Sequence, residues 1–309
     1  MPRRGPKGKP DMRLDDLDPT DNARDLGQGG GGFGGGGGLG GLIGILPLLM
    51  GRKMGCGTIL LLAVVVGFMM FGGGLGSIMG GGGTPQAVPG QRQAGGNVAC
   101  DTEAELFACR VMRSTEQVWE QYFAASGQRY AAPTINFFTQ SNQSACGAAQ
   151  AAMGPFYCPA DQGIYLDTSF FDELTQRFGA QGDFAAAYVV GHEVGHHIQT
   201  ITGISDQVRQ AQARGGQAEG NALQVRMELQ ADCYAGVWAK RSGRMEPGDL
   251  EEGLTAANAI GDDTLQRSAG QRPVPESFTH GTSEQRMNWL RRGFASGDPK
   301  SCDTFSGEV

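Results

Sequence analysis

Two histidines and a glutamate, His192, Glu193 and His196, have the types and spacing of a zinc site. Residues four apart on a helix lie on one face, so both imidazoles can reach one ion. Zn²⁺ binds neutral imidazole, and a catalytic site has three protein ligands and one position for water. Glu193 would be the general base that takes a proton from that water. This motif therefore predicts a zinc-dependent hydrolase.

The surroundings of the motif favour a buried metal site. The preceding residues, from Phe184 to Val190, are apolar and compatible with a helix. Gly191 and Gly195 each cost about 1 kcal/mol relative to Ala inside a helix. Close approach of a metal, a substrate or a packed element would offset that cost. The alternative is a pair of structural histidines, which would need hydrogen-bond partners that the apolar helix does not itself offer.

A third ligand is expected from Glu228 or Asp232, which lie four residues apart on a later predicted helix. We assign Glu228 to the metal and Asp232 to a ligand histidine, whose tautomer it would fix by accepting a hydrogen bond. The reverse assignment stays open. The alternative is an exposed acidic face, which the apolar residues next to both acids disfavour.

Three further residues are candidates for supporting roles. His280, in a loop, would stabilise the oxyanion that forms when water adds to a carbonyl, although a loop histidine can also be structural. Tyr234 is a weaker candidate for the same task. His197 lies about 100° around the helix from His196, so it is expected to pack or to hydrogen-bond behind the site. The strand over 163–168 is a candidate for pairing with an extended substrate along its edge.

The composition divides the chain into four parts. Glycine, 52 residues in all, gathers between 27 and 83, where too few side chains remain to form a core. We expect a disordered, basic and glycine-rich cytoplasmic arm over 1–55, one transmembrane helix over 56–79 and a linker over 80–96. The folded domain would be 97–309. A net charge of −7 argues against nucleic acid as a partner.

The apolar segment over 56–79 sets the expected location. It contains no charged residue and is long enough to span a bilayer. Arg52 and Lys53 precede it, which predicts a cytoplasmic N-terminus and a single-pass inner (plasma) membrane protein whose domain is periplasmic or extracellular. Six of the seven cysteines follow the segment, so disulfides are expected, with Cys146 and Cys158 paired by proximity. Six reduced, buried thiols are the alternative.

Hydrophobic periodicity and turn residues predict an α+β domain, mainly helical with a small sheet. The expected helices cover 103–125, 169–178, 183–202, 221–241, 249–260 and 283–293, and the expected strands cover 133–139, 156–158 and 163–168.

Four motifs in order make the chain similar to the neutral zinc metallopeptidase family of bacteria. They are His192-Glu-Val-Gly-His-His-Ile-Gln199, Glu228-Leu-Gln-Ala-Asp-Cys-Tyr-Ala-Gly236, Ala259-Ile-Gly-Asp-Asp263 and Thr279-His-Gly-Thr-Ser-Glu-Gln-Arg286. The resemblance covers nearly the whole chain. It implies a membrane-anchored, zincin-like peptidase with zinc at His192 and His196 and catalysis at Glu193. Analogy with the broader thermolysin-like (gluzincin) peptidases supports Glu228 as third ligand.

The expected function is therefore Zn²⁺-dependent hydrolysis of peptide bonds in envelope or extracellular proteins. One rival is a non-catalytic, membrane-anchored envelope protein that holds structural zinc and binds partners, and such a site would be closed by four protein ligands. A second rival is a membrane-tethered scaffold without metal. The sequence specifies neither a particular peptide substrate nor an oligomeric state.

Overall fold

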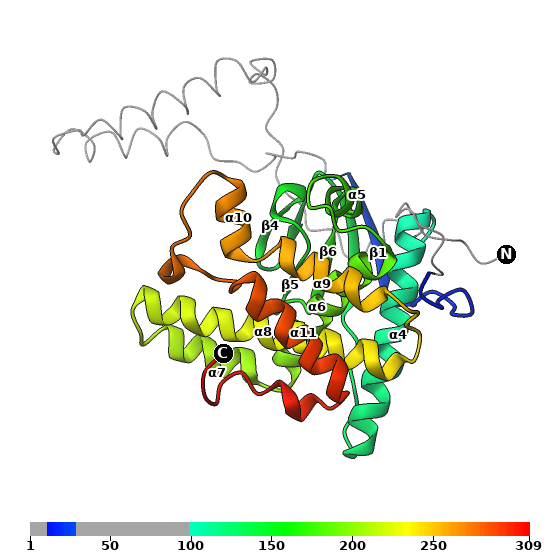
Figure 1. Cartoon of the computed structure of the whole chain (residues 1–309). Helices are drawn as coiled ribbons and strands as arrows, with labels where there is room; N and C mark the ends of the chain where they lie inside the picture. Colours follow the sequence, from blue (N-terminus) through cyan, green and yellow to red (C-terminus); the bar gives the residue numbers. More distant parts are fainter. Residues whose placement is uncertain (1–10, 29–98) are drawn as a thin grey trace, which may run out of the picture. The chain divides into compact units, whose positions relative to one another are not determined.

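The computed structural model describes residues 11–28 and 99–309, which belong to one folded unit (Figure 1). The linker predicted over 80–96, the transmembrane helix predicted over 56–79 and the remainder of the predicted arm lie outside the described residues. Within the described parts the α+β prediction is confirmed, since helices predominate and a four-stranded sheet and a two-stranded sheet accompany them.

The helices follow the predicted order, with two additions. They are α4 (Glu103–Ala125), α5 (Ser169–Gln176), α6 (Asp183–Ile201), α7 (Ile204–Gln212), α8 (Gln217–Ser242), α9 (Asp249–Ala259), α10 (Asp262–Ser268) and α11 (Ser283–Ser296), with 3₁₀ turns η1 (Ala151–Met153), η2 (Pro275–Ser277) and η3 (Pro299–Cys302). The short helices α7 and α10 were not predicted, because their mostly polar sequences carry few apolar residues.

The main sheet has the order β1-β2-β6-β5. Its strands are β1 (Ala23–Gln28), β2 (Thr134–Thr139), β5 (Phe156–Cys158) and β6 (Gly163–Leu166), and β3 (Ser141–Ser144) and β4 (Gly147–Gln150) form a separate hairpin. β1, β2 and β6 run parallel, and β5 is antiparallel to β6. β6 is therefore paired on both sides, so the prediction that its edge binds substrate is wrong.

Glycines let two pairs of core helices, α6 with α8 and α8 with α11, approach closely. A Cβ atom at Gly195 of α6 would lie 2.9 Å from the Ala231 Cα of α8, and one at Gly191 would lie 2.8 Å from the Trp238 ring. On the other side of α8, Gly236 and Gly293 allow the backbones of α8 and α11 to meet, and Figure 1 shows these two helices packed together. Close helix packing, one of the reasons expected for Gly191 and Gly195, is confirmed.

The N-terminal segment, residues 11–28, is part of the folded unit and corrects the boundary predicted at 97. Its side chains Met12, Leu14 and Leu17 are buried in the main hydrophobic core. The Thr20 hydroxyl donates to the buried Glu116 carboxylate of α4, and β1 pairs with β2. A short ordered segment was missed because the glycine-rich residues that follow it dominate the local composition.

The predicted location in the membrane is wrong. No helix in the described residues is both long and apolar enough to cross a membrane, since the long helices α4, α6 and α8 all carry ionisable residues. Residues 11–28 and 99–309 also share one core.

Three disulfides join the six cysteines that lie in the described residues: Cys100–Cys109, Cys146–Cys158 and Cys233–Cys302. The pair predicted from proximity, Cys146 with Cys158, is confirmed. It ties the β3–β4 hairpin to β5, whereas Cys233–Cys302 ties α8 to η3 near the C-terminus.

A buried carboxylate outside the metal motif makes stability depend on pH. Asp183, Asp249 and Glu252 place carboxylate oxygens within 4.8 Å of one another. Burial raises the pKa of Asp249 to about 7. A hydrogen bond from the Glu246 amide acts against this rise, and the negative charges of Asp183, Glu252 and Glu246 add to it. A carboxyl whose pKa is raised on folding stabilises the fold at low pH, and this contribution is lost as pH rises through the folded pKa.

Asp249→Asn should remove that loss. We compare the free energy of unfolding of the variant with that of the unsubstituted protein at each pH. The difference in favour of the variant should be about 2 to 4 kcal/mol larger at pH 8.5 than at pH 4, given about 1.4 kcal/mol for each unit of pKa shift. Urea unfolding of both metal-free proteins across this range measures the difference. A difference that does not change with pH would show that Asp249 is ionised throughout.

Candidate metal centre

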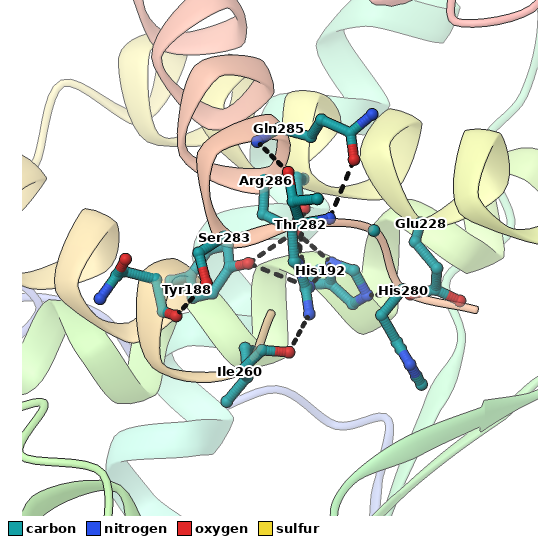
Figure 2. A network of polar contacts seen from close by, with 12 residues as sticks. Tyr188, His192, Glu228, Ile260, His280, Thr282, Ser283, Gln285 and Arg286 are labelled. Atoms are coloured by element: carbon teal, nitrogen blue, oxygen red, sulfur yellow. Dashed lines mark hydrogen bonds and ion pairs between the residues drawn. The ribbon is translucent and has the colours of Figure 1, made fainter. Parts of the chain in front are cut away.

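Helices α6 and α8 bring together three of the predicted ligands. The Nε2 atoms of His192 and His196 lie 3.1 Å and 3.4 Å from the same Glu228 oxygen, Oε2. One ligand atom from each of the three residues lies within 4.8 Å of the other two. All three side chains are largely buried, and Figure 2 shows His192 facing Glu228 across the two helices.

This arrangement needs a cation at its centre. The Nδ1 of His192 lies 2.7 Å from Asp232 Oδ1, so Nδ1 carries a hydrogen and the neutral ring presents a lone pair at Nε2. That lone pair would face a carboxylate oxygen, an arrangement of two acceptors that only a proton or a metal ion can relieve. The two imidazoles and one carboxylate are ligands that Zn²⁺ prefers, so the residues fit a zinc ion.

The pKa shifts of His192 and Glu228 also indicate a site that favours a positive charge. Burial alone would lower the pKa of His192, but Asp232 and Glu228 outweigh it and raise that pKa to about 10. For Glu228 the balance is reversed. Burial would raise its pKa, yet His196 and His192 hold it well below its usual range. The site therefore strongly favours a positive charge between these groups.

Asp232 lies behind His192, which favours the first of the two assignments made above. Its Oδ1 accepts from the Tyr188 hydroxyl at 2.6 Å as well as from His192. Arg286 of α11 forms a two-pronged ion pair with it, at 2.9 Å from both Nε and Nη2. Asp232 and Arg286 are 0% and 2% exposed. The carboxylate thus holds the imidazole in one tautomer and orientation. Figure 2 shows Tyr188, His192 and Arg286 gathered at this point.

Several partners of the ligands were not predicted. Tyr188 precedes His192 by one helical turn, Gln199 follows His196 by three residues, and Gln224 precedes Glu228 by four. The Gln224 amide donates to Glu228 Oε1 at 2.8 Å and so leaves Oε2 for the histidines. Their helical spacing was a usable signal for these three. Arg286 gave none, because it comes from a distant helix and its burial depends on tertiary packing.

Glu193 lies beside the ligands without joining them. Its side chain is 6% exposed and lines the same cavity. Burial raises the pKa of Glu193, although His192 and His196 act against this effect. A carboxylate with a raised pKa is a better proton acceptor near neutral pH, as a general base requires.

The ligands open onto a cavity of about 670 Å³, within the range of pockets that hold ligands. The cavity is lined by residues of β5 and the loop before it, of α5, α6, α7, α10 and the first half of α8, and of the loop that carries His280. Its apolar lining residues include Met153, Pro155, Phe156, Phe170, Phe178, Val208, Met227, Ile260 and Leu265.

His280 lies at the rim of this cavity. Its side chain is half-exposed, and its Nδ1 is 3.1 Å from the Thr279 hydroxyl and 3.3 Å from Asp262 Oδ1. The Asp262 carboxylate accepts hydrogen bonds from the backbone amides of Thr279, His280 and Gly281. The loop is therefore held in place, and His280, labelled in Figure 2, is one of the residues that line the cavity.

Tyr234 and His197 lie away from the ligands. Tyr234 is buried edge-on against Trp119, with ring centres 5.7 Å apart, and does not line the cavity. Its predicted role is wrong, because the tyrosine faces the core side of α8. The Nε2 of His197 donates to the Ala131 carbonyl at 2.7 Å, and its Nδ1 accepts from the Tyr157 hydroxyl at 3.1 Å. Burial lowers the pKa of His197 to about 4, so it stays neutral behind the site, as predicted.

Comparisons with known proteins found one matching family and several similar chains. A model of the family described as "Putative neutral zinc metallopeptidase" matches residues 12–305. The uncharacterized protein YpfJ of Escherichia coli is 47% identical over 258 residues, which cover 82% of this chain and 88% of that protein. The uncharacterized protein Rv2575 of Mycobacterium tuberculosis is 40% identical over 227 residues, 67% of this chain and 74% of that protein. No solved structure gives a significant match.

Proposed function

Because this chain belongs to the neutral zinc metallopeptidase family, we propose that it hydrolyses peptide bonds with zinc held by His192, His196 and Glu228. The observation that carries the proposal is the convergence of two imidazole nitrogens and one carboxylate oxygen, within 4.8 Å of one another, beside a cavity. A bound zinc ion supplies Lewis-acid polarisation of a carbonyl and lowers the pKa of water.

The residues of the chain handle the protons. Glu193 takes a proton from the attacking water and passes it to the leaving amine, because it lines the cavity and is not needed as a ligand. Asp232, neutralised by Arg286, keeps His192 in the tautomer whose Nε2 is free. Gln224 fixes the far oxygen of Glu228.

His280 is the proposed donor to the oxyanion. The Asp262 carboxylate can only accept, so His280 Nδ1 carries the hydrogen that faces it, and the ring donates from Nε2 when it is in the protonated form. Tyr157 also lines the cavity, but its hydroxyl hydrogen is used by His197. Among these two cavity residues, His280 is therefore the one able to donate to a developing negative charge.

Strand β5 is the proposed docking edge for an extended peptide. Within the described residues it pairs only with β6, and it forms one edge of the main sheet. Phe156 and Tyr157 of this strand line the cavity. A peptide added along the outer side of β5 would make main-chain hydrogen bonds and place alternate side chains in the cavity. This replaces β6, the strand first considered.

The rival of a structural zinc site is less well supported. Such sites are closed by four protein ligands, whereas the cluster in the described part of the chain contains three residues of the ligating types. The open side faces a cavity that can admit substrate.

Metal removal tests the proposed function. The purified full chain should contain about one zinc per molecule by elemental analysis and should cleave members of a peptide library, detected by mass spectrometry. Treatment with 1,10-phenanthroline should abolish cleavage, and added zinc should restore it. The non-chelating 1,7-phenanthroline is the matched control. Absence of bound zinc, or cleavage that survives chelation, would overturn the proposal.

A further inference from the structure

Two buried glutamines connect the second histidine of the site to the C-terminal segment. His196 Nδ1 lies 2.9 Å from Gln199 Oε1. The Gln199 amide donates to Gln230 Oε1 at 3.1 Å, and the Gln230 amide donates to the carbonyl of Cys302 at 2.9 Å. Gln199 and Gln230 are 0% and 4% exposed. Burial of two complete amide groups costs free energy unless each group finds hydrogen-bond partners. These hydrogen bonds therefore restrict the orientations that the two glutamines and the neighbouring His196 ring can adopt.

The direction of these hydrogen bonds is fixed by their far end. A backbone carbonyl can only accept, so the Cys302 oxygen requires the NH₂ group of Gln230. The oxygen of Gln230 then faces Gln199 and requires its NH₂ group, which also donates to the Met227 carbonyl at 2.7 Å. Reversal of either amide would bring two donors or two acceptors together. The oxygen of Gln199 must therefore point at His196.

This order sets the tautomer of His196. Nδ1 has to carry the hydrogen that Gln199 accepts, which leaves the lone pair of the neutral ring on Nε2, the atom that faces Glu228. His192 reaches the same state through the charged pair of Asp232 and Arg286. The two ligands are thus oriented by different means, one ionic and one made only of neutral amides.

The Cys302 carbonyl is itself held against α8. Cys302 is joined to Cys233 by a disulfide. Next to it, the Thr304 hydroxyl donates to the Arg226 carbonyl at 2.7 Å, and the Arg226 guanidinium donates to the Thr304 and Gly307 carbonyls. These contacts leave the carbonyl little freedom to move away from Gln230.

We propose that the C-terminal segment around Cys302 positions the metal ligand His196 through the Gln230–Gln199 relay. The inference rests on the proposed zinc site. It makes Gln199, Gln230 and the Cys302 carbonyl positioning elements, none of which contacts the substrate or the metal. Loss of the relay lets the His196 ring turn and exchange tautomers, so that fewer molecules present Nε2 to the ion.

Zinc affinity of single variants tests the relay. Gln199→Leu removes the acceptor of His196 and should weaken zinc binding roughly 10- to 100-fold, the usual effect of losing such a partner. Gln230→Met preserves size, leaves Gln199 anchored only by Met227, and should measurably weaken binding, by up to about 10-fold. Dissociation constants come from competition with a chromophoric chelator. Gln217→Met, at the exposed start of the same helix, is the matched control and should bind as the unsubstituted protein does.

A second readout separates positioning from folding. In the zinc-bound, ¹⁵N-labelled protein, NMR should show the His196 hydrogen on Nδ1, and Gln230→Met should broaden or shift that signal while the metal-free variant keeps a cooperative thermal transition. Unchanged affinity and an unchanged His196 signal in Gln230→Met would overturn the relay, whatever Gln199→Leu does. If the unsubstituted protein binds no zinc, the proposed function fails instead, and the two failures are distinguishable.

Discussion

Glu193→Gln should lose peptide hydrolysis while the protein keeps its zinc. Glutamine has nearly the size of glutamate but cannot accept a proton, and Glu193 is not among the three converging ligands. Loss of a general base lowers the rate by roughly 10²- to 10⁴-fold. We therefore expect kcat/KM for the best library peptide to fall within this range, with the zinc content still near one per chain by elemental analysis.

Glu284→Gln is the matched control for this substitution. Glu284 is exposed on α11 and does not line the cavity, so its variant should retain full activity. Equal cleavage by the Glu193 variant and the unsubstituted protein would place the general base on another residue or the activity in a contaminant. A loss of zinc together with activity would show that Glu193 is a ligand.

Asp232→Ala should damage both the fold and the metal site. The substitution leaves the Arg286 guanidinium buried without its carboxylate partner, and removal of one member of a buried ion pair typically costs about 3 to 5 kcal/mol. It also removes the acceptor of His192 Nδ1, which should weaken zinc binding roughly 10- to 100-fold. Urea unfolding of the metal-free protein and chelator competition measure the two effects separately.

The double variant Asp232→Ala/Arg286→Met distinguishes these effects. It removes the unpaired charge and should recover a large part of the lost stability, whereas zinc affinity should stay low because His192 still lacks its acceptor. Such non-additivity is expected for residues in direct contact. A single variant as stable as the unsubstituted protein would show that Arg286 finds other compensation.

Local spacing accounts for what could be predicted. His192, Glu193 and His196 share one turn of helix, and the acids Glu228 and Asp232 share another, so a period of 3.6 residues is enough to group them. The features that could not be predicted depend on how helices and strands pack against one another. That α11 would deliver Arg286 to Asp232, or that β5 and not β6 would form the sheet edge, depends on contacts between distant residues that no local pattern encodes.

Composition gave wrong predictions of the domain boundary and of the location where it was averaged over long windows. The glycine-rich residues after 28 concealed the short segment that contributes Leu14 and Leu17 to the core. An uncharged apolar run was taken as the determinant of location, yet the parts of the chain on either side of it share that core. Apolar length measures the tendency of a segment to leave water, and it carries no information on which other segments meet across it.

The contacts of residues 11–28 also bear on the order of folding. β1 is synthesised first, but its partner β2 begins at Thr134, and Thr20 meets Glu116, 96 positions later. Closing so long a loop costs entropy that only many simultaneous contacts offset, and such long-range pairings slow folding. We expect the segment to dock last, after α4, α6 and α8 have packed. Contacts formed after the transition state mainly slow unfolding, so residues 11–28 would add chiefly to the kinetic stability of the finished protein.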